Sequence, residues 1–231
     1  NLIPYVQQAW LLAQRFDAVV ANPPYLASKG MGFELKEFIA KNYPTSKSDL
    51  FAAFIERGFL LIKDSGINAQ VTLQTWMFLS GLKEFREWMI SEKCIKNILQ
   101  IGYNSFPELN SKIVQCAVLV SENQKRKGYH GVYINLNKAP QSANKEEVFL
   151  QGSEKATFLI DQDKFSCIPG SPIAYWISEK LRETFAGSLS IESVAPVRQG
   201  FQTGDNDRFL RLWHEVDFSK FEFNAESKDQ V

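Results

Sequence analysis

The sequence predicts an α/β fold, in which helices cover an open sheet whose strands are joined by right-handed crossovers. Segments with strand character alternate with segments with helical character over residues 2–136, which is the pattern of such a sheet. Residues 16–21 are almost continuously apolar, as is typical of a parallel strand buried on both faces. The residues after Ser48 repeat their large apolar side chains at helical spacing, so a helix is expected to follow.

Five segments are expected to form strands. They are residues 16–21, 69–73, 95–101, 113–120 and 129–136. The segment that separates the last two is charged and resembles a turn, so residues 129–136 are expected to pair back on residues 113–120 as a hairpin.

Helical spacing of apolar residues predicts five helices. They cover residues 2–15, 33–42, Ser48 up to the stop at Ser65-Gly66, 81–91 and 172–187. In the first helix, Val6 and Trp10 belong to an apolar stripe. In the last helix, Ser171 is expected to be the N-cap and Pro172 to occupy the first turn. The third helix is expected to turn five apolar side chains to one face: Phe51, Phe54, Ile55, Phe59 and Ile62.

Composition divides the chain and excludes several classes of protein. The sheet domain is expected to end near residue 140, a connecting segment to cover 141–187, and short strands and turns to cover 188–231. No run of about 18 apolar residues is present, so no membrane span is expected. Three scattered cysteines and two histidines indicate a reducing cytoplasm and no metal site. The formal net charge of zero means that any basic DNA-binding surface is local or lies outside this chain.

The motif with the clearest chemistry is Asn22-Pro23-Pro24-Tyr25, directly after the strand at 16–21. Ligands of open α/β sheets bind beyond the carboxyl ends of the strands. There the Asn22 side-chain oxygen and the Pro23 carbonyl can accept N–H groups from a planar amine such as adenine, while the prolines hold both acceptors in place. The Tyr25 ring can stack on such a base. An ordinary turn is the alternative interpretation.

The residues around this motif resemble adenine-N6 DNA methyltransferases of the gamma arrangement, in which the cofactor motif comes first, the catalytic motif next and target recognition last. Residues 16–25 resemble the catalytic motif, residues 48–57 the helix beside the cofactor, and residues 72–78 the next strand with its exit loop. The resemblance implies that S-adenosylmethionine is the cofactor and that three residues contact it: Asp49, Leu50 and Phe54. It also implies that Phe106, in residues 105–107, stacks on the flipped base. Helix start for Asp49, core packing for Phe54 and loop anchoring for Phe106 are the alternatives.

Four further segments resemble the adenine-specific methyltransferases of BREX-type phage-defence systems. They are residues 27–32, 46–51, 168–176 and 203–211. This family implies double-stranded DNA as the substrate and defence-system proteins as partners. By the same resemblance, residues 1–140 are the catalytic half of a Rossmann-like methyltransferase domain and residues 188–231 begin the target-recognition domain. Contact with DNA at this junction is expected from Arg198, Arg208 and Arg211, with solvated surface arginines as the alternative.

The glycine-rich cofactor loop of the family should precede Asn22 by many residues, and only 21 residues precede it here. The chain is therefore expected to be an internal fragment that binds the cofactor weakly or not at all by itself. Two other functions stay open, because Asn-Pro-Pro-Tyr also serves enzymes that methylate RNA bases or protein glutamine. The first is methylation of one of those acceptors, and the second is a DNA-binding module of a defence complex without catalysis.

Overall fold

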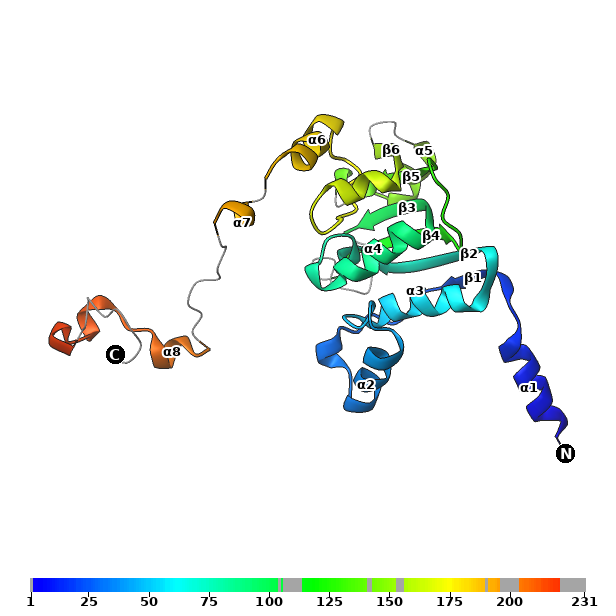
Figure 1. The fold of residues 1–231 in the computed structure, drawn as a ribbon, viewed down its shortest axis with the longest axis horizontal. Coiled ribbons are helices and arrows are strands. Elements are labelled where there is room, and N and C mark those ends of the chain that lie inside the picture. Colours follow the sequence, from blue (N-terminus) through cyan, green and yellow to red (C-terminus); the bar gives the residue numbers. More distant parts are fainter. Residues whose placement is uncertain are drawn as a thin grey trace. The chain divides into compact units, whose positions relative to one another are not determined.

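The computed structural model describes residues 2–103, 105, 114–140, 143–152, 156–189, 191–195 and 204–220. The chain divides into two units, residues 1–188 and residues 189–231. The first unit contains the sheet and the second, in its described part, contains only short helices (Figure 1). These are α7 (Ile191–Val194), α8 (Asn206–Phe209) and two single 3-10 turns. The prediction of short strands after residue 188 is therefore wrong for the described residues of that unit.

The first unit is built on one six-stranded sheet, which confirms the predicted α/β class. Its strands are β1 (Phe16–Ala21), β2 (Ile62–Leu73), β3 (Cys94–Gly102), β4 (Cys116–Glu122), β5 (His130–Asn135) and β6 (Thr157–Asp161). Their order across the sheet is β1-β2-β4-β3-β5-β6. β1 pairs with β2 and β3 with β5 in parallel, while β4 is antiparallel to both of its neighbours.

Two sequence expectations about this sheet are wrong. The predicted hairpin does not form, because β3 lies between β4 and β5 and pairs with both of them. The sheet also does not end near residue 140, because β6 adds an antiparallel strand beside β5. The turn-like composition of residues 121–128 predicted the hairpin, but pairing across the sheet decided which strands are neighbours.

Four of the five predicted helices form close to their expected bounds. They are α1 (Ile3–Ala13), α2 (Phe33–Asn42), α3 (Leu50–Leu61) and α4 (Lys83–Glu92). α3 ends at Leu61 rather than at Ser65-Gly66, because the chain enters β2 at Ile62. A further short helix, α5 (Lys145–Gln151), was not predicted.

The last predicted helix begins later than expected. α6 covers Glu179–Gly187, and its N-cap is Ser178, whose hydroxyl accepts from the Leu181 amide. Ser171 does not cap it and instead has a left-handed φ of 48°. Residues before Ser178 leave the helix because the Ile173 and Tyr175 side chains are drawn into the core, where both are fully buried.

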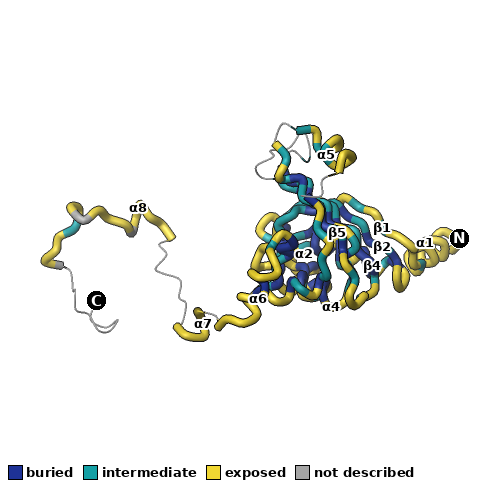
Figure 2. The backbone as a smooth tube through the Cα atoms, turned by 90° about the horizontal axis from the view of Figure 1, so that it is seen from above, coloured by how far each residue is buried: buried dark blue, intermediate teal, exposed yellow. Residues whose placement is uncertain are grey.

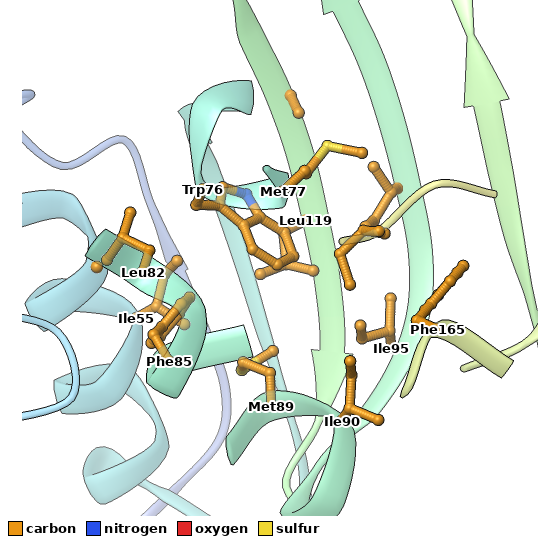
Figure 3. Packing of buried hydrophobic residues seen from close by; sticks show 14 of the residues in the cluster. Ile55, Trp76, Met77, Leu82, Phe85, Met89, Ile90, Ile95, Leu119 and Phe165 are labelled. Atoms are coloured by element: carbon orange, nitrogen blue, oxygen red, sulfur yellow. The ribbon is translucent and has the colours of Figure 1, made fainter. Parts of the chain in front are cut away.

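One face of the sheet carries the core. Buried residues of α3 and α4 form a single cluster with those of β3 and β4, so both helices cover the same face. Figure 3 shows Trp76, Phe85 and Met89 packed beside Leu119 and Ile95 in this cluster. From Gly66 to Leu73 along β2, the residues on this face are buried while those between them are only half-buried, so the second face is less covered.

β1 is parallel to β2, as predicted, but it is not buried on both faces. Among the described residues it is an edge strand with β2 as its one neighbour, and Val20 is 82% exposed. The apolar stripe of α1 is likewise exposed at Val6 and Trp10. Figure 2 shows α1 in the colour of exposed residues. Among the described residues, no helix combines the length and the apolar character that crossing a membrane requires.

Candidate functional site around Asn-Pro-Pro-Tyr

The Asn-Pro-Pro-Tyr segment lies where the sequence predicted it, at the carboxyl end of β1. The strand ends at Ala21, and the first proline prevents its continuation because it has no N–H to donate to the sheet. Pro23 is buried, Asn22 and Pro24 are exposed, and Tyr25 is half-buried. The Asn22 amide is therefore accessible to solvent, while the backbone beside it is anchored in the protein.

The Tyr25 hydroxyl is directed at the Asn22 side chain. It donates a hydrogen bond to the Asn22 Oδ1 atom over 3.1 Å, and its ring meets the Phe51 ring edge-to-face with 6.2 Å between centroids. Burial raises the pKa of this hydroxyl well above its ordinary range. Tyr25 thus stays protonated at neutral pH and remains a donor to Asn22.

Cys116 also contacts Tyr25, although nothing in the sequence singles it out. It opens β4, is fully buried, and places its sulfur 3.5 Å from the Tyr25 hydroxyl oxygen. Its amide donates to the Ser105 hydroxyl at 3.1 Å. Cys116 and Tyr25 are 91 positions apart in the sequence, so only the pairing of the strands brings them together.

The loop after Tyr25 is tied to the start of α3. The Leu26 amide donates to Asp49 Oδ1 at 3.2 Å, and the Leu50 amide donates to the Leu26 carbonyl at 3.0 Å. Asp49 is the N-cap of α3, since the same oxygen accepts from the Phe51 amide at 3.4 Å. Burial raises the pKa of the Asp49 carboxyl. These bonds support the helix-start interpretation of Asp49, and contact with the cofactor stays a prediction.

Leu50 and Phe54 line one pocket on the outer side of α3. The pocket has a volume of about 420 Å³ and lies between α2 and α3. Its other lining residues are Leu35, Phe38, Ile39, Tyr43, Ala53 and Arg57. The alternative interpretation placed Phe54 in the core. Phe54 is instead 41% exposed, so it does not join the core. Its ring is available to a ligand on this side of the helix.

A cluster of neutral amides, which the sequence did not reveal, lies at the same edge of the sheet. The amide cluster consists of Gln74, Gln100, Gln115 and Asn137, at or just beyond the ends of β2, β3, β4 and β5. Gln74 Oε1 accepts from Gln100 Nε2 at 2.7 Å and from Asn137 Nδ2 at 3.3 Å. Gln74 Nε2 donates to Gln115 Oε1. The Asn137 Oδ1 atom is buried and has no hydrogen-bond partner among the described residues.

The remaining predicted site residues are Phe106, Arg198, Arg208 and Arg211. Phe106 and Arg198 lie outside the described residues. Arg208 and Arg211 are exposed in the second unit, where the Arg208 amide donates to Asp205 and the Arg211 guanidinium donates to the Asp207 carbonyl at 2.8 Å. Their contact with DNA stays a prediction.

The α/β sheet and the Asn-Pro-Pro-Tyr loop at a strand end are the two features in which this chain resembles methyltransferases. Residues 5–106 match the family described as Eco57I restriction-modification methylase. The fold alone is shared with a type I restriction-modification methyltransferase subunit from Streptococcus thermophilus. That subunit is 17% identical with a TM-score of 0.50, and the match covers 67% of this chain and 36% of that one.

Two curated relatives are adenine-specific methyltransferases. The chain is 40% identical to BrxX of Escherichia coli O9:H4 (strain HS) over 96% of its length and 39% identical to PglX of Lacticaseibacillus casei (strain Zhang) over 92%. It spans 18% of the length of each. These matches confirm the resemblance that the motifs indicated: the chain is homologous, over nearly its whole length, to one segment of these adenine-specific methyltransferases.

Proposed function

We propose that the full-length protein transfers a methyl group from S-adenosylmethionine to the N6 amine of adenine in double-stranded DNA, as part of phage defence or restriction-modification. The observation that carries this proposal is the Asn22 side-chain oxygen, which is exposed at the end of β1 and held by the Tyr25 hydroxyl. The names of the two adenine-specific relatives support the choice of acceptor.

The chemistry of this site suits an aromatic amine. The lone pair of such an amine is delocalised into its ring, so the nitrogen is a weak nucleophile. An N–H group that donates to Asn22 Oδ1 leaves more electron density on nitrogen, and the Pro23 carbonyl can accept the second N–H. Because both prolines fix the backbone, these acceptors need no rearrangement when the substrate arrives. A strong general base is not required before attack.

The pocket beside α3 fits part of the cofactor. Its apolar and aromatic lining, which includes Leu50 and Phe54, suits the adenine ring of a nucleoside. S-adenosylmethionine, when bound, supplies a methyl group attached to a positively charged sulfur. The carbon of that methyl group is electrophilic. We assign Leu50 and Phe54 to contact with this cofactor, and Asp49 to holding their helix against the catalytic loop through Leu26.

DNA contact requires residues beyond the catalytic loop. An adenine inside a duplex must be flipped out of the stack, which costs a few kcal/mol and requires contacts that hold the opened duplex. We assign Phe106 and Tyr25 to stacking on the flipped base. We assign Arg198, Arg208 and Arg211 to the phosphates at the junction with a recognition domain, which residues 188–231 begin.

Expression of the full-length protein in a host without other adenine methylation tests this function. Mass spectrometry of digested DNA should detect N6-methyladenine with the wild type and not with Asn22→Ala. Loss of one preorganised hydrogen-bond partner, measured for oxyanion-hole donors, lowers the rate by about 10²–10³-fold, and a loss of this order is expected here. Asn42→Ala, at an exposed asparagine that ends α2, is the matched control and should keep full methylation.

Other outcomes of the same experiment identify the competing functions. If RNA bases or protein glutamine were methylated while the DNA stayed unmodified, the methyl acceptor would be RNA or protein and not adenine in DNA. Full DNA methylation by Asn22→Ala would mean that this loop does not catalyse the reaction and would favour a DNA-binding role.

A further inference from the structure

Cys116 is placed to act on the catalytic loop through Tyr25. Its thiol is fully buried at the start of β4, and its sulfur lies 3.5 Å from the Tyr25 hydroxyl oxygen, to which it donates. Tyr25 in turn donates to Asn22 Oδ1 at 3.1 Å. The three side chains thus form one line of hydrogen bonds, which runs from the Cys116 thiol through the Tyr25 hydroxyl to the amide oxygen of Asn22.

The direction of this line determines which end of the Asn22 amide faces the substrate. A tyrosine hydroxyl carries one proton and can also accept a hydrogen bond. When the Cys116 thiol donates to the hydroxyl oxygen, the tyrosine proton is free to point at Asn22, which must then present its oxygen. Without that donor, the Asn22 NH₂ group could donate to Tyr25 instead, and the amide would turn its oxygen away. An amide oxygen accepts two hydrogen bonds, so one position stays open for the substrate amine.

The position of Cys116 is itself fixed by the sheet. It pairs with Leu73 of β2 on one side and with Gly102 of β3 on the other. Its amide donates to the Ser105 hydroxyl, which donates to the Gly102 carbonyl at 2.6 Å. Burial raises the pKa of the thiol, so Cys116 keeps the proton that it donates at neutral pH.

We propose that Cys116 is a positioning residue for the methyl-transfer site, acting through the Tyr25 hydroxyl to hold the Asn22 side-chain oxygen toward the acceptor nitrogen. This inference rests on the function proposed above. It gives the Tyr25 hydroxyl a task separate from that of its ring, which is available for stacking on the base.

A double-mutant cycle in the full-length protein tests the proposal. Initial rates of methyl transfer to a DNA duplex are measured for Cys116→Ala, Tyr25→Phe and the double variant. Each single change should lower kcat about fivefold, the factor that one neutral hydrogen bond is worth, with KM for DNA unchanged. The double variant should be no slower than either single variant, because both changes break the same line of hydrogen bonds.

Two further variants separate positioning from packing. Cys116→Ser keeps a donor and should retain most of the wild-type kcat. Cys94→Ala removes the other buried cysteine, which begins β3 at the opposite edge of the sheet, and should leave kcat unchanged. Thermal melting of each variant reports on folding. If Cys116→Ala does not fold, Cys116→Val, which fills a similar volume without a donor, takes its place in the cycle with Tyr25→Phe.

The proposal and the function beneath it fail in different ways. If Asn22→Ala is inactive but Cys116→Ala and Tyr25→Phe keep the wild-type kcat, the positioning role is overturned and the function stands. Additive losses in the double variant also overturn it, since they would mean that the two residues act separately. If Asn22→Ala is fully active, the proposed function itself is overturned.

Discussion

The two edges of the central sheet contain different kinds of polar group. At the edge where β1, β2 and β3 end, the polar side chains that hydrogen-bond to one another are neutral: Asn22, Tyr25, Cys116 and the amide cluster. At the opposite edge, the buried Glu122 carboxylate is paired with Lys96 and Arg126. We call these the neutral edge and the charged edge.

The difference indicates what each edge does. Ion pairs at the charged edge hold strand ends and the following turn together, and there the carboxylate is stabilised by its partners. At the neutral edge, hydrogen-bond acceptors are available without the desolvation cost of a buried charge. Such a surface suits a neutral amine, which needs directed acceptors rather than an opposite charge. Substitutions at the two edges test this contrast, from the largest expected effect to the smallest.

Gly102→Ala should cause the largest loss of stability, at the neutral edge. Gly102 has a left-handed φ of 72°, and a Cβ atom there would lie 1.3 Å from Asn137 Oδ1. Overpacking of this kind costs about 1–3 kcal/mol, and the backbone conformation adds about 1 kcal/mol. Urea unfolding of the chain measures the loss.

Gly128→Ala is the matched control for Gly102→Ala. It has nearly the same φ, 68°, but nothing within 4 Å of the added Cβ atom, and it follows β4 on the side of the charged edge. Only the backbone cost of about 1 kcal/mol should appear. Equal losses for the two variants would show that Asn137 is free to move and that the amide cluster is not a fixed structure.

Glu122→Gln should lower stability in a pH-dependent way. Its hydrogen bond with Arg126 and its pairing with Lys96 hold the pKa of the Glu122 carboxyl below its ordinary value. A depressed pKa means that the carboxylate stabilises the fold above the ordinary glutamate pKa, and this contribution is lost as the pH falls through the depressed value. Thermal midpoints should drop by about 2–4 °C at pH 7, the shift that about 1 kcal/mol produces in a chain of this size.

The control for Glu122→Gln is the same comparison at low pH, where both side chains are neutral and the midpoints should converge. A difference that persists at low pH would show that the substituted glutamine side chain packs poorly and that charge is not the cause.

Asp49→Ala should cost about 0.5–1 kcal/mol through loss of the α3 cap, whereas Asp49→Asn keeps the cap and should cost less. Because burial raises the Asp49 pKa, its ionisation lowers stability as the pH rises through that value, which is opposite in sign to Glu122. Thermal melts of both variants at acidic and at neutral pH measure this. A large loss for Asp49→Asn at neutral pH would give the negative charge a role beyond capping.

The smallest expected effect is in cofactor binding by the chain alone. Calorimetric titration of residues 1–231 with S-adenosylmethionine should give weak binding or none, because the pocket beside α3 offers mainly apolar contacts. A micromolar dissociation constant would contradict this. A Phe54→Ala variant would then test whether the pocket beside α3 is the site, with Phe33→Ala, an exposed phenylalanine of α2 outside the pocket lining, as the control.

The features of both edges that could be predicted are the local ones. Asn22 at a strand end, the helix after Asp49 and five of the six strands were predicted because each depends on neighbouring residues. The hairpin between β4 and β5, the burial of β1 and the start of α6 were wrong. Each of these depends on what lies across the sheet or on competition for the core, as with Tyr175.

By itself, the sequence determined the α/β class, the position of Asn-Pro-Pro-Tyr and the neutral hydrogen-bond acceptors that this motif offers, because these follow from local periodicity and side-chain chemistry. Tertiary structure alone decided that Cys116 reaches Tyr25 and that four amides gather at the same edge. The physical reason is the antiparallel pairing of β4 between β2 and β3, which brings residues far apart in the chain to one edge.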